Sequence, residues 1–133
     1  MEREDAWPIY AGTVERELAL AAAPDTALLG DALHRALDRL NRLGERIAGW
    51  SREAKEIAAP QMAETMAALY AAALLAAEAS FAFERSDEEG ALALATARRY
   101  HDHVLEPALE RLARHTNVDP RSAADVTAAV VRS

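Results

Sequence analysis

Apolar residues recur every three or four positions along the chain, and no stretch alternates apolar and polar residues as a strand does. The clearest pattern lies in residues 25–48. Its apolar positions are separated by steps of four, three, four, three and four: Leu29, Leu33, Ala36, Leu40, Leu43 and Ile47. This spacing places the side chains on one stripe of a helix, as in the seam of a bundle or coiled coil. We therefore predict a helix that begins at Asp25 or Thr26, either of which can cap it, and ends near Ala48.

Two other long helices are predicted on either side of this one. The first covers about residues 9–22 and stops before Pro24. After a short helical turn that follows Ser51, the next covers about residues 60–84. It begins at Pro60 because proline suits the first position of a helix. Residues 60–84 are apolar on nearly all sides, so we expect this helix to be the most buried element.

A fourth long helix is predicted over about residues 86–116. Ser86 and Glu89 have the spacing of a capping box, in which each side chain bonds the backbone N–H of the other residue. Pro107 lies inside this helix and removes one backbone hydrogen bond, which predicts a kink. A shorter C-terminal helix is predicted over about residues 120–131.

These elements are long, their connections are short, and no internal repeat or linker interrupts them. The expected fold is therefore all-α: an up-down bundle of four main helices plus a short C-terminal helix, in a single domain over residues 1–133. The hydrophobic residues, 51% of the chain, are mostly Ala and Leu, and aromatic residues are only 5%. Because Ala forms helices well and fills little volume, the helices should pack closely through small side chains.

The charge and the residue types exclude several classes of function. Fifteen basic against twenty-two acidic residues give a net charge of −7 without a basic stripe, so we expect no nucleic-acid partner. The lack of cysteine excludes disulfides, a thiolate nucleophile and Cys-ligated metals. Glu64 and Glu78 interrupt the longest apolar stretch, residues 62–83, and residues 1–5 are too charged for a signal peptide. We therefore expect a cytoplasmic protein with no membrane partner and no cofactor.

Unusual polar residues gather on the predicted fourth helix. Its core stripe steps by four and three through Leu94, Arg98, His101, Leu105, Ala108 and Leu112. Polar groups on such a stripe need partners inside the protein. We therefore predict a structural polar core in which Arg98 pairs with a buried carboxylate, Glu78 or Glu64, and His101 is a satisfied core histidine.

A metal site is one alternative use of the polar residues. Two triplets have the i, i+3, i+7 spacing of a single helix face: Asp31, His34 and Asp38 on one helix, and His103, Glu106 and Glu110 on another. Two such faces could meet around a metal ion, as in carboxylate-bridged sites of helical bundles. The usual Glu-x-x-His pairs are absent, however, and carboxylates at helical spacing are more often a solvated face.

A ribonuclease site is a second alternative. Arg98 and His103 have the Arg-x4-His spacing of HEPN-domain nucleases, which are also small helical bundles. In such a site the arginine steadies a phosphate while the histidine moves a proton. On a straight helix, however, two residues five apart point about 140° away from each other. The acidic composition also opposes RNA binding.

One stretch resembles a known family. Residues 95–100 have the sequence ATARRY and residues 104–107 have the sequence VLEP. Together they resemble the ATARxY…LLP signature in the C-terminal helical extension of large acyl-CoA dehydrogenases. The aromatic-tipped helix over 69–83 and the segment 43–50, which ends at Trp50, are similar to parts of that extension in the same order. The resemblance covers about residues 28–112.

The resemblance implies a helical module without its own chemistry. In that family the flavin, the acyl-CoA substrate and the catalytic glutamate belong to a preceding dehydrogenase core, so no catalytic residue carries over to this chain. We therefore predict a non-catalytic bundle that forms a homo-oligomer or packs on a larger enzyme subunit. Self-association through an apolar face is expected, since the two central helices carry more apolar surface than their neighbours can easily cover.

Overall fold

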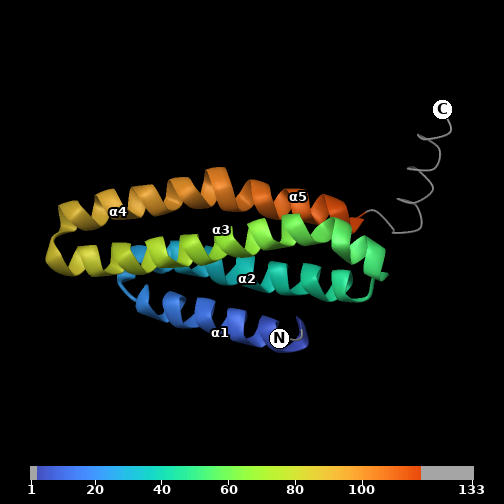
Figure 1. The fold of residues 1–133 in the computed structure, drawn as a ribbon. Coiled ribbons are helices and arrows are strands. Elements are labelled where there is room, and N and C mark those ends of the chain that lie inside the picture. The colour runs from blue at the N-terminus through green and yellow to red at the C-terminus, as the bar shows by residue number, and fades with distance from the viewer. Residues whose placement is uncertain (1–2, 118–133) are drawn as a thin grey trace.

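The computed structural model describes residues 3–117, and over this range the chain is an all-α, up-down bundle (Figure 1). Its elements are α1 (Arg3–Leu20), a 3-10 turn η1 (Pro24–Thr26), α2 (Ala27–Ala48), α3 (Arg52–Arg85), α4 (Asp87–Tyr100), a π-helix (His101–Leu105) and α5 (Glu106–Asn117). The last three follow one another without a break and form the fourth rod of the bundle. The predicted fold class is confirmed for the described residues. The predicted helix over 120–131 lies outside them.

Helix α3 is the centre of the bundle and packs against α1, α2, α4 and α5. Figure 1 shows α1 on one side of α3, α4 and α5 on the other, and α2 behind. Two hydrogen bonds hold the N-terminal segment parallel to α3. The Tyr10 hydroxyl donates to the Met66 carbonyl (2.6 Å), and the Ala23 amide donates to the Ser80 hydroxyl (3.0 Å). Burial raises the pKa of Tyr10 above its ordinary value, which favours the protonated phenol that donates.

The predicted stripe on α2 forms one wall of the core. All six of its residues are buried, and the wall faces fully buried leucines from α3 and α5. The side of α3 that packs into the bundle is instead mostly alanine, including Ala72, Ala76 and Ala79. On α4 the buried residues are Gly90, Leu94 and Ala97. The expectation of close packing through small residues therefore holds best between α3 and α4.

Helix α3 begins earlier than predicted, at Arg52 rather than Pro60. The Ser51 hydroxyl caps this start by accepting a hydrogen bond from the Ala54 amide (3.3 Å). The missing N–H of Pro60 leaves the carbonyl of Glu56 without its helical donor. Because Pro60 and Glu56 are both exposed, water can take that place and the helix continues.

The expectation that α3 is the most buried element is only half right. By length and composition alone, α3 could cross a membrane, a test that the core helix of a bundle also passes. Half of its most apolar stretch is buried inside the bundle, and the other half is not. Leu74 and Phe81 are among its exposed residues. One side of α3 therefore lacks a cover within the described chain.

The predicted disturbance near Pro107 takes the form of the π-helix just before it. The Glu106 amide donates to the His101 carbonyl, five residues back instead of four. In an α-helix the ring of Pro107 would press against the carbonyl of His103. The wider turn is the local solution, and π-turns of this kind are frequent at functional sites.

Candidate functional site

The predicted polar core is wrong for three of its four residues. Arg98, Glu78 and Glu64 are all exposed. Glu64 does form an ion pair, but at the surface and with Arg111 (3.0 Å) rather than with Arg98. Helix α4 faces α3 through the stripe that contains Gly90, Leu94 and Ala97, so residue 98 lies one step outside that stripe.

His101 is the one predicted core residue that the structure partly buries, with 14% of its side chain exposed, but it is not the satisfied histidine that was predicted. Its Nδ1 lies 2.9 Å from Oδ1 of Asp102, and its Nε2 lies 3.3 Å from Oε1 of Glu106. The second contact has the distance of an ion pair but not the angle of a hydrogen bond, so Nε2 is shielded from water without a hydrogen-bond partner. Oε2 of Glu106 in turn lies 3.8 Å from Nη1 of Arg39. This chain of contacts ties the π-helix to α2.

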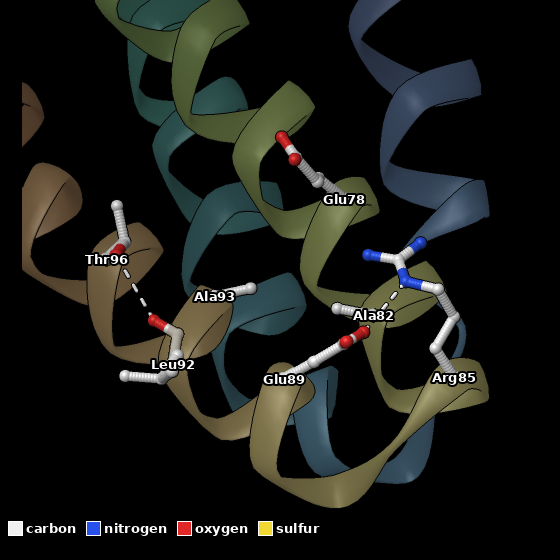
Figure 2. A pocket seen from close by; sticks show the side chains of 7 residues that line it. All are labelled: Glu78, Ala82, Arg85, Glu89, Leu92, Ala93 and Thr96. Atoms are coloured by element: carbon white, nitrogen blue, oxygen red, sulfur yellow. Dashed lines mark hydrogen bonds and ion pairs between the residues drawn. The ribbon is translucent and has the colours of Figure 1, made fainter.

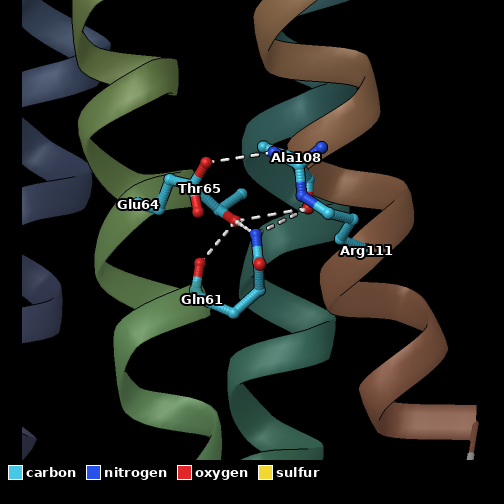
Figure 3. A network of polar contacts seen from close by, with 5 residues as sticks. All are labelled: Gln61, Glu64, Thr65, Ala108 and Arg111. Carbon is cyan, nitrogen blue, oxygen red and sulfur yellow. Dashed lines mark hydrogen bonds and ion pairs between the residues drawn. The ribbon is translucent and has the colours of Figure 1, made fainter.

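A second polar network joins α3 to α5 and was not predicted (Figure 3). Thr65 is fully buried, and its hydroxyl donates to the Gln61 carbonyl (2.7 Å) and lies 3.4 Å from the Ala108 carbonyl. The side-chain Nε2 of Gln61 also donates to the Ala108 carbonyl (3.4 Å), and the Glu64–Arg111 ion pair flanks the network. A threonine on an otherwise alanine-lined helix side was the available signal in the sequence. The network fixes two helices to each other and lies beside no described groove.

The residues of the alternative metal site are not brought together. Within residues 3–117, no group of three or more His, Asp or Glu side chains could hold a metal ion. Five of the six proposed ligands are exposed: Asp31, His34, Asp38, His103 and Glu110. His34 bonds its own helix, with Nδ1 2.8 Å from the Gly30 carbonyl, and Glu106 faces the cation Arg39 instead of a second carboxylate face.

The two residues of the alternative nuclease site do not share a groove. Arg98 lines a shallow groove on α4 that η1 and the end of α3 border, together with Asp25, Phe83, Asp87, Ala91, Leu94 and Ala95. His103 is exposed on the π-helix and does not line that groove. The carboxylates of Asp25 and Asp87 line the same groove and add negative charge, which disfavours a phosphate there.

The more distinctive surface is formed by the exposed side of α3 and the start of α4. Leu74, Glu78, Phe81 and Arg85 follow one another on α3 at steps of four, three and four, which is the spacing of a helix seam. Leu74 is 39% exposed, Phe81 42%, and Leu92 of α4 67%. We call these five residues the outer face.

A shallow, open groove of about 430 Å³ lies between α3 and α4 at the edge of the outer face (Figure 2). It is lined by Glu78, Ala82, Arg85, Glu89, Leu92, Ala93 and Thr96. Nε of Arg85 donates to Oε2 of Glu89 (2.9 Å), whereas Glu78 forms no ion pair within residues 3–117. The face therefore combines large apolar side chains with charges of both signs, and its acid at position 78 lacks a partner in the described chain.

Comparison with known proteins leaves this surface as the main guide to function. No known protein family, curated protein or solved structure matches the chain. The resemblance of residues 28–112 to the extension of acyl-CoA dehydrogenases therefore stays a hypothesis.

Proposed function

We propose that this chain is a non-catalytic helical module that associates with itself through the outer face. The observation that carries the proposal is the exposure of Leu74 and Phe81 at seam spacing on α3. Leu92 of α4, also exposed, lines a groove with Glu78 and Arg85 of the same face. A contiguous exposed apolar patch normally marks an interface, whereas single exposed leucines need no explanation.

The polar residues support the same proposal. Arg98 and His103 line no common groove, and the ring of His101 lies between the carboxylates of Asp102 and Glu106. A general acid or base needs an open position beside a substrate. The contacts of His101 instead serve to hold the π-helix against α2.

The resemblance to the dehydrogenase extension suggests another partner, a larger enzyme on which the module packs. The outer face has features that favour a second copy. Its charges are of both signs and lie on one helix, so the same surface can complement itself, as a twofold interface requires. An enzyme partner would show itself by co-purification in place of self-association.

Sedimentation velocity over about 1 to 100 μM, a range that covers weak association, tests the proposal. We expect the wild type to form an oligomer and Phe81→Glu to sediment as a monomer with unchanged helicity. The matched control is Leu28→Glu, because Leu28 is also an exposed leucine (74%) but lies at the start of α2. The control should associate like the wild type. A wild type that is monomeric throughout the range, or a Phe81→Glu variant that associates normally, would contradict the proposal.

A further inference from the structure

We infer that two copies pair antiparallel through the last turns of α3, so that Glu78 of each copy faces Arg85 of the other. This inference rests on the proposed function and adds the partner's orientation and register. Its starting point is the order of side chains along the outer face: an acid at 78, an aromatic ring at 81 and a base at 85.

The three residues form one line on the exposed side of α3. Glu78 and Arg85 are seven residues apart, which is close to two helical turns and about 10.5 Å along the axis. Phe81 lies between them on the same stripe, and Figure 2 shows Glu78 and Arg85 on the same side of α3. All three are exposed.

The charges select the direction of the second helix. A parallel pair would place the two Glu78 side chains together and the two Arg85 side chains together, and like charges at a helix seam oppose pairing. An antiparallel pair reverses one copy, so that each acid can face a base. Two equivalent ion pairs then flank one twofold axis.

The charges also select the register. If Glu78 faces Arg85, the axis passes midway between them, beside Phe81 and Ala82, and the two phenyl rings meet at the axis. Ala82 is nearly fully buried and small, so it offers no obstacle to a second helix. A register in which Leu74 faces Phe81 would overlap more of α3, but it would bring the two Glu78 carboxylates together at the axis.

Arg85 can bond Glu89 of its own copy and Glu78 of the other copy at the same time. Its hydrogen bond to Glu89 uses Nε, and a guanidinium carries five N–H donors in a fixed fork. The remaining donors are available to a carboxylate from outside, while Glu89 restrains the side chain in place. Glu78, which forms no ion pair within residues 3–117, is the matching acceptor.

Charge reversal of the two residues tests the register in the full chain. Counting positions 78 and 85 alone, Glu78→Arg places four bases in the interface and Arg85→Glu places four acids, and the second variant also sets an acid against Glu89. Each variant alone should therefore self-associate at least about tenfold more weakly than wild type. An equimolar mixture of the two variants restores both ion pairs, as does the double variant Glu78→Arg/Arg85→Glu. We expect both to regain dimers close to the wild-type dissociation constant. Native mass spectrometry with one isotope-labelled variant identifies the mixed dimer, and circular dichroism checks that each variant is folded.

The outcomes separate this inference from the proposed function. Single variants that associate like wild type, or a mixture that stays monomeric, would overturn the antiparallel register while self-association through Phe81 stands. A wild type that is monomeric at every concentration would overturn both. Weak single variants with a restored mixture and a restored double variant support the register.

Discussion

Two halves of the bundle are built from different side chains, although α3 belongs to both. On the side of α2 and α5 the core consists of fully buried leucines: Leu33, Leu40, Leu69, Leu105, Leu109 and Leu112. On the side of α4 the buried residues are mostly small, with alanines on α3 and with Gly90 and Ala97 beside Leu94 on α4. In the first half large side chains fill the space between the helices. In the second half small side chains let the helix backbones lie close together.

The difference sets what each half tolerates. A buried leucine contributes about 1.5–3 kcal/mol and a buried methyl group about 0.8 kcal/mol, so the leucine side contributes more of the stability per residue. An alanine-lined contact loses little when an atom is removed, but it has no room for one more. Removing side-chain atoms should therefore destabilise the first half, and adding side-chain atoms should destabilise the second.

The largest effect is expected from a truncation on the leucine side. Leu109→Ala should lower the free energy of unfolding by about 2–5 kcal/mol, because the lost contacts leave a cavity among α2, α3 and α5. Urea denaturation followed by circular dichroism measures the change. The same substitution at the exposed Leu28 should stay within about 0.5 kcal/mol of wild type. Equal costs at the two positions would mean that the leucine side is not the main source of stability.

An addition on the alanine side should have the next largest effect. A Cβ atom at Gly90 would overlap the ring of Phe83, so Gly90→Ala should destabilise the bundle by about 1–3 kcal/mol through overpacking. The higher helix propensity of Ala offsets about 1 kcal/mol of this cost, so the expected net loss is at most about 2 kcal/mol. Thermal or urea unfolding gives the net sign.

Gly12, on α1, supplies the control for the substitution at Gly90. A Cβ there meets no atom within 4 Å, so Gly12→Ala should be stabilising by about 0.5–1 kcal/mol, the opposite sign to Gly90→Ala. Phe83→Leu in the Gly90→Ala background should recover part of the loss by making room for the methyl group. If both glycine variants are stabilising, the α3–α4 contact has spare room and the comparison fails.

The smallest effect concerns the hydrogen bond that joins α1 to α3. Tyr10→Phe should cost about 0.5–1.5 kcal/mol at neutral pH, since the Met66 carbonyl loses a donor. Burial raises the pKa of Tyr10 in the folded state above the ordinary value of 10.0, so this contribution is complete below pH 10 and is lost as the pH rises further. Urea denaturation of both proteins at neutral pH and above pH 10 should show the difference shrinking. A difference that grows with pH would contradict the assignment of the phenol as donor.

The sequence predicted well what depends on periodicity. Every residue of the α2 stripe is buried, because a sustained three-and-four spacing leaves one helix face for the core. The sequence was a poorer guide where two adjacent stripes of one helix could each face the core. Arg98 and Leu94 belong to the same four-step row, yet α4 turns Ala97 inward and Arg98 outward, since the small residues allow the closer approach to α3.

The candidate site was predictable only in outline. The excess of apolar surface on the central helices was expected, but its location was not, because α3 is apolar nearly all round and the sequence does not say which sides α1, α2 and α4 cover. Periodicity also did not separate His101, which lies between two carboxylates, from Arg98, which lies at the surface. That distinction depends on neighbours from α2 and on the wider turn before Pro107.

The π-helix has a consequence for how the chain tolerates changes in length. A π-turn holds one residue more than the α-turn it replaces, so deleting one residue within 101–105 can restore a plain helix without rotating the two ends against each other. Replacing Pro107 in the same step would remove the ring that presses on the carbonyl four residues back in a regular turn. A single deletion in the middle of α2 would instead rotate half of its seam by about 100°. We therefore expect the fourth rod of the bundle to tolerate the loss of one residue at 101–105 better than α2 tolerates one in its middle.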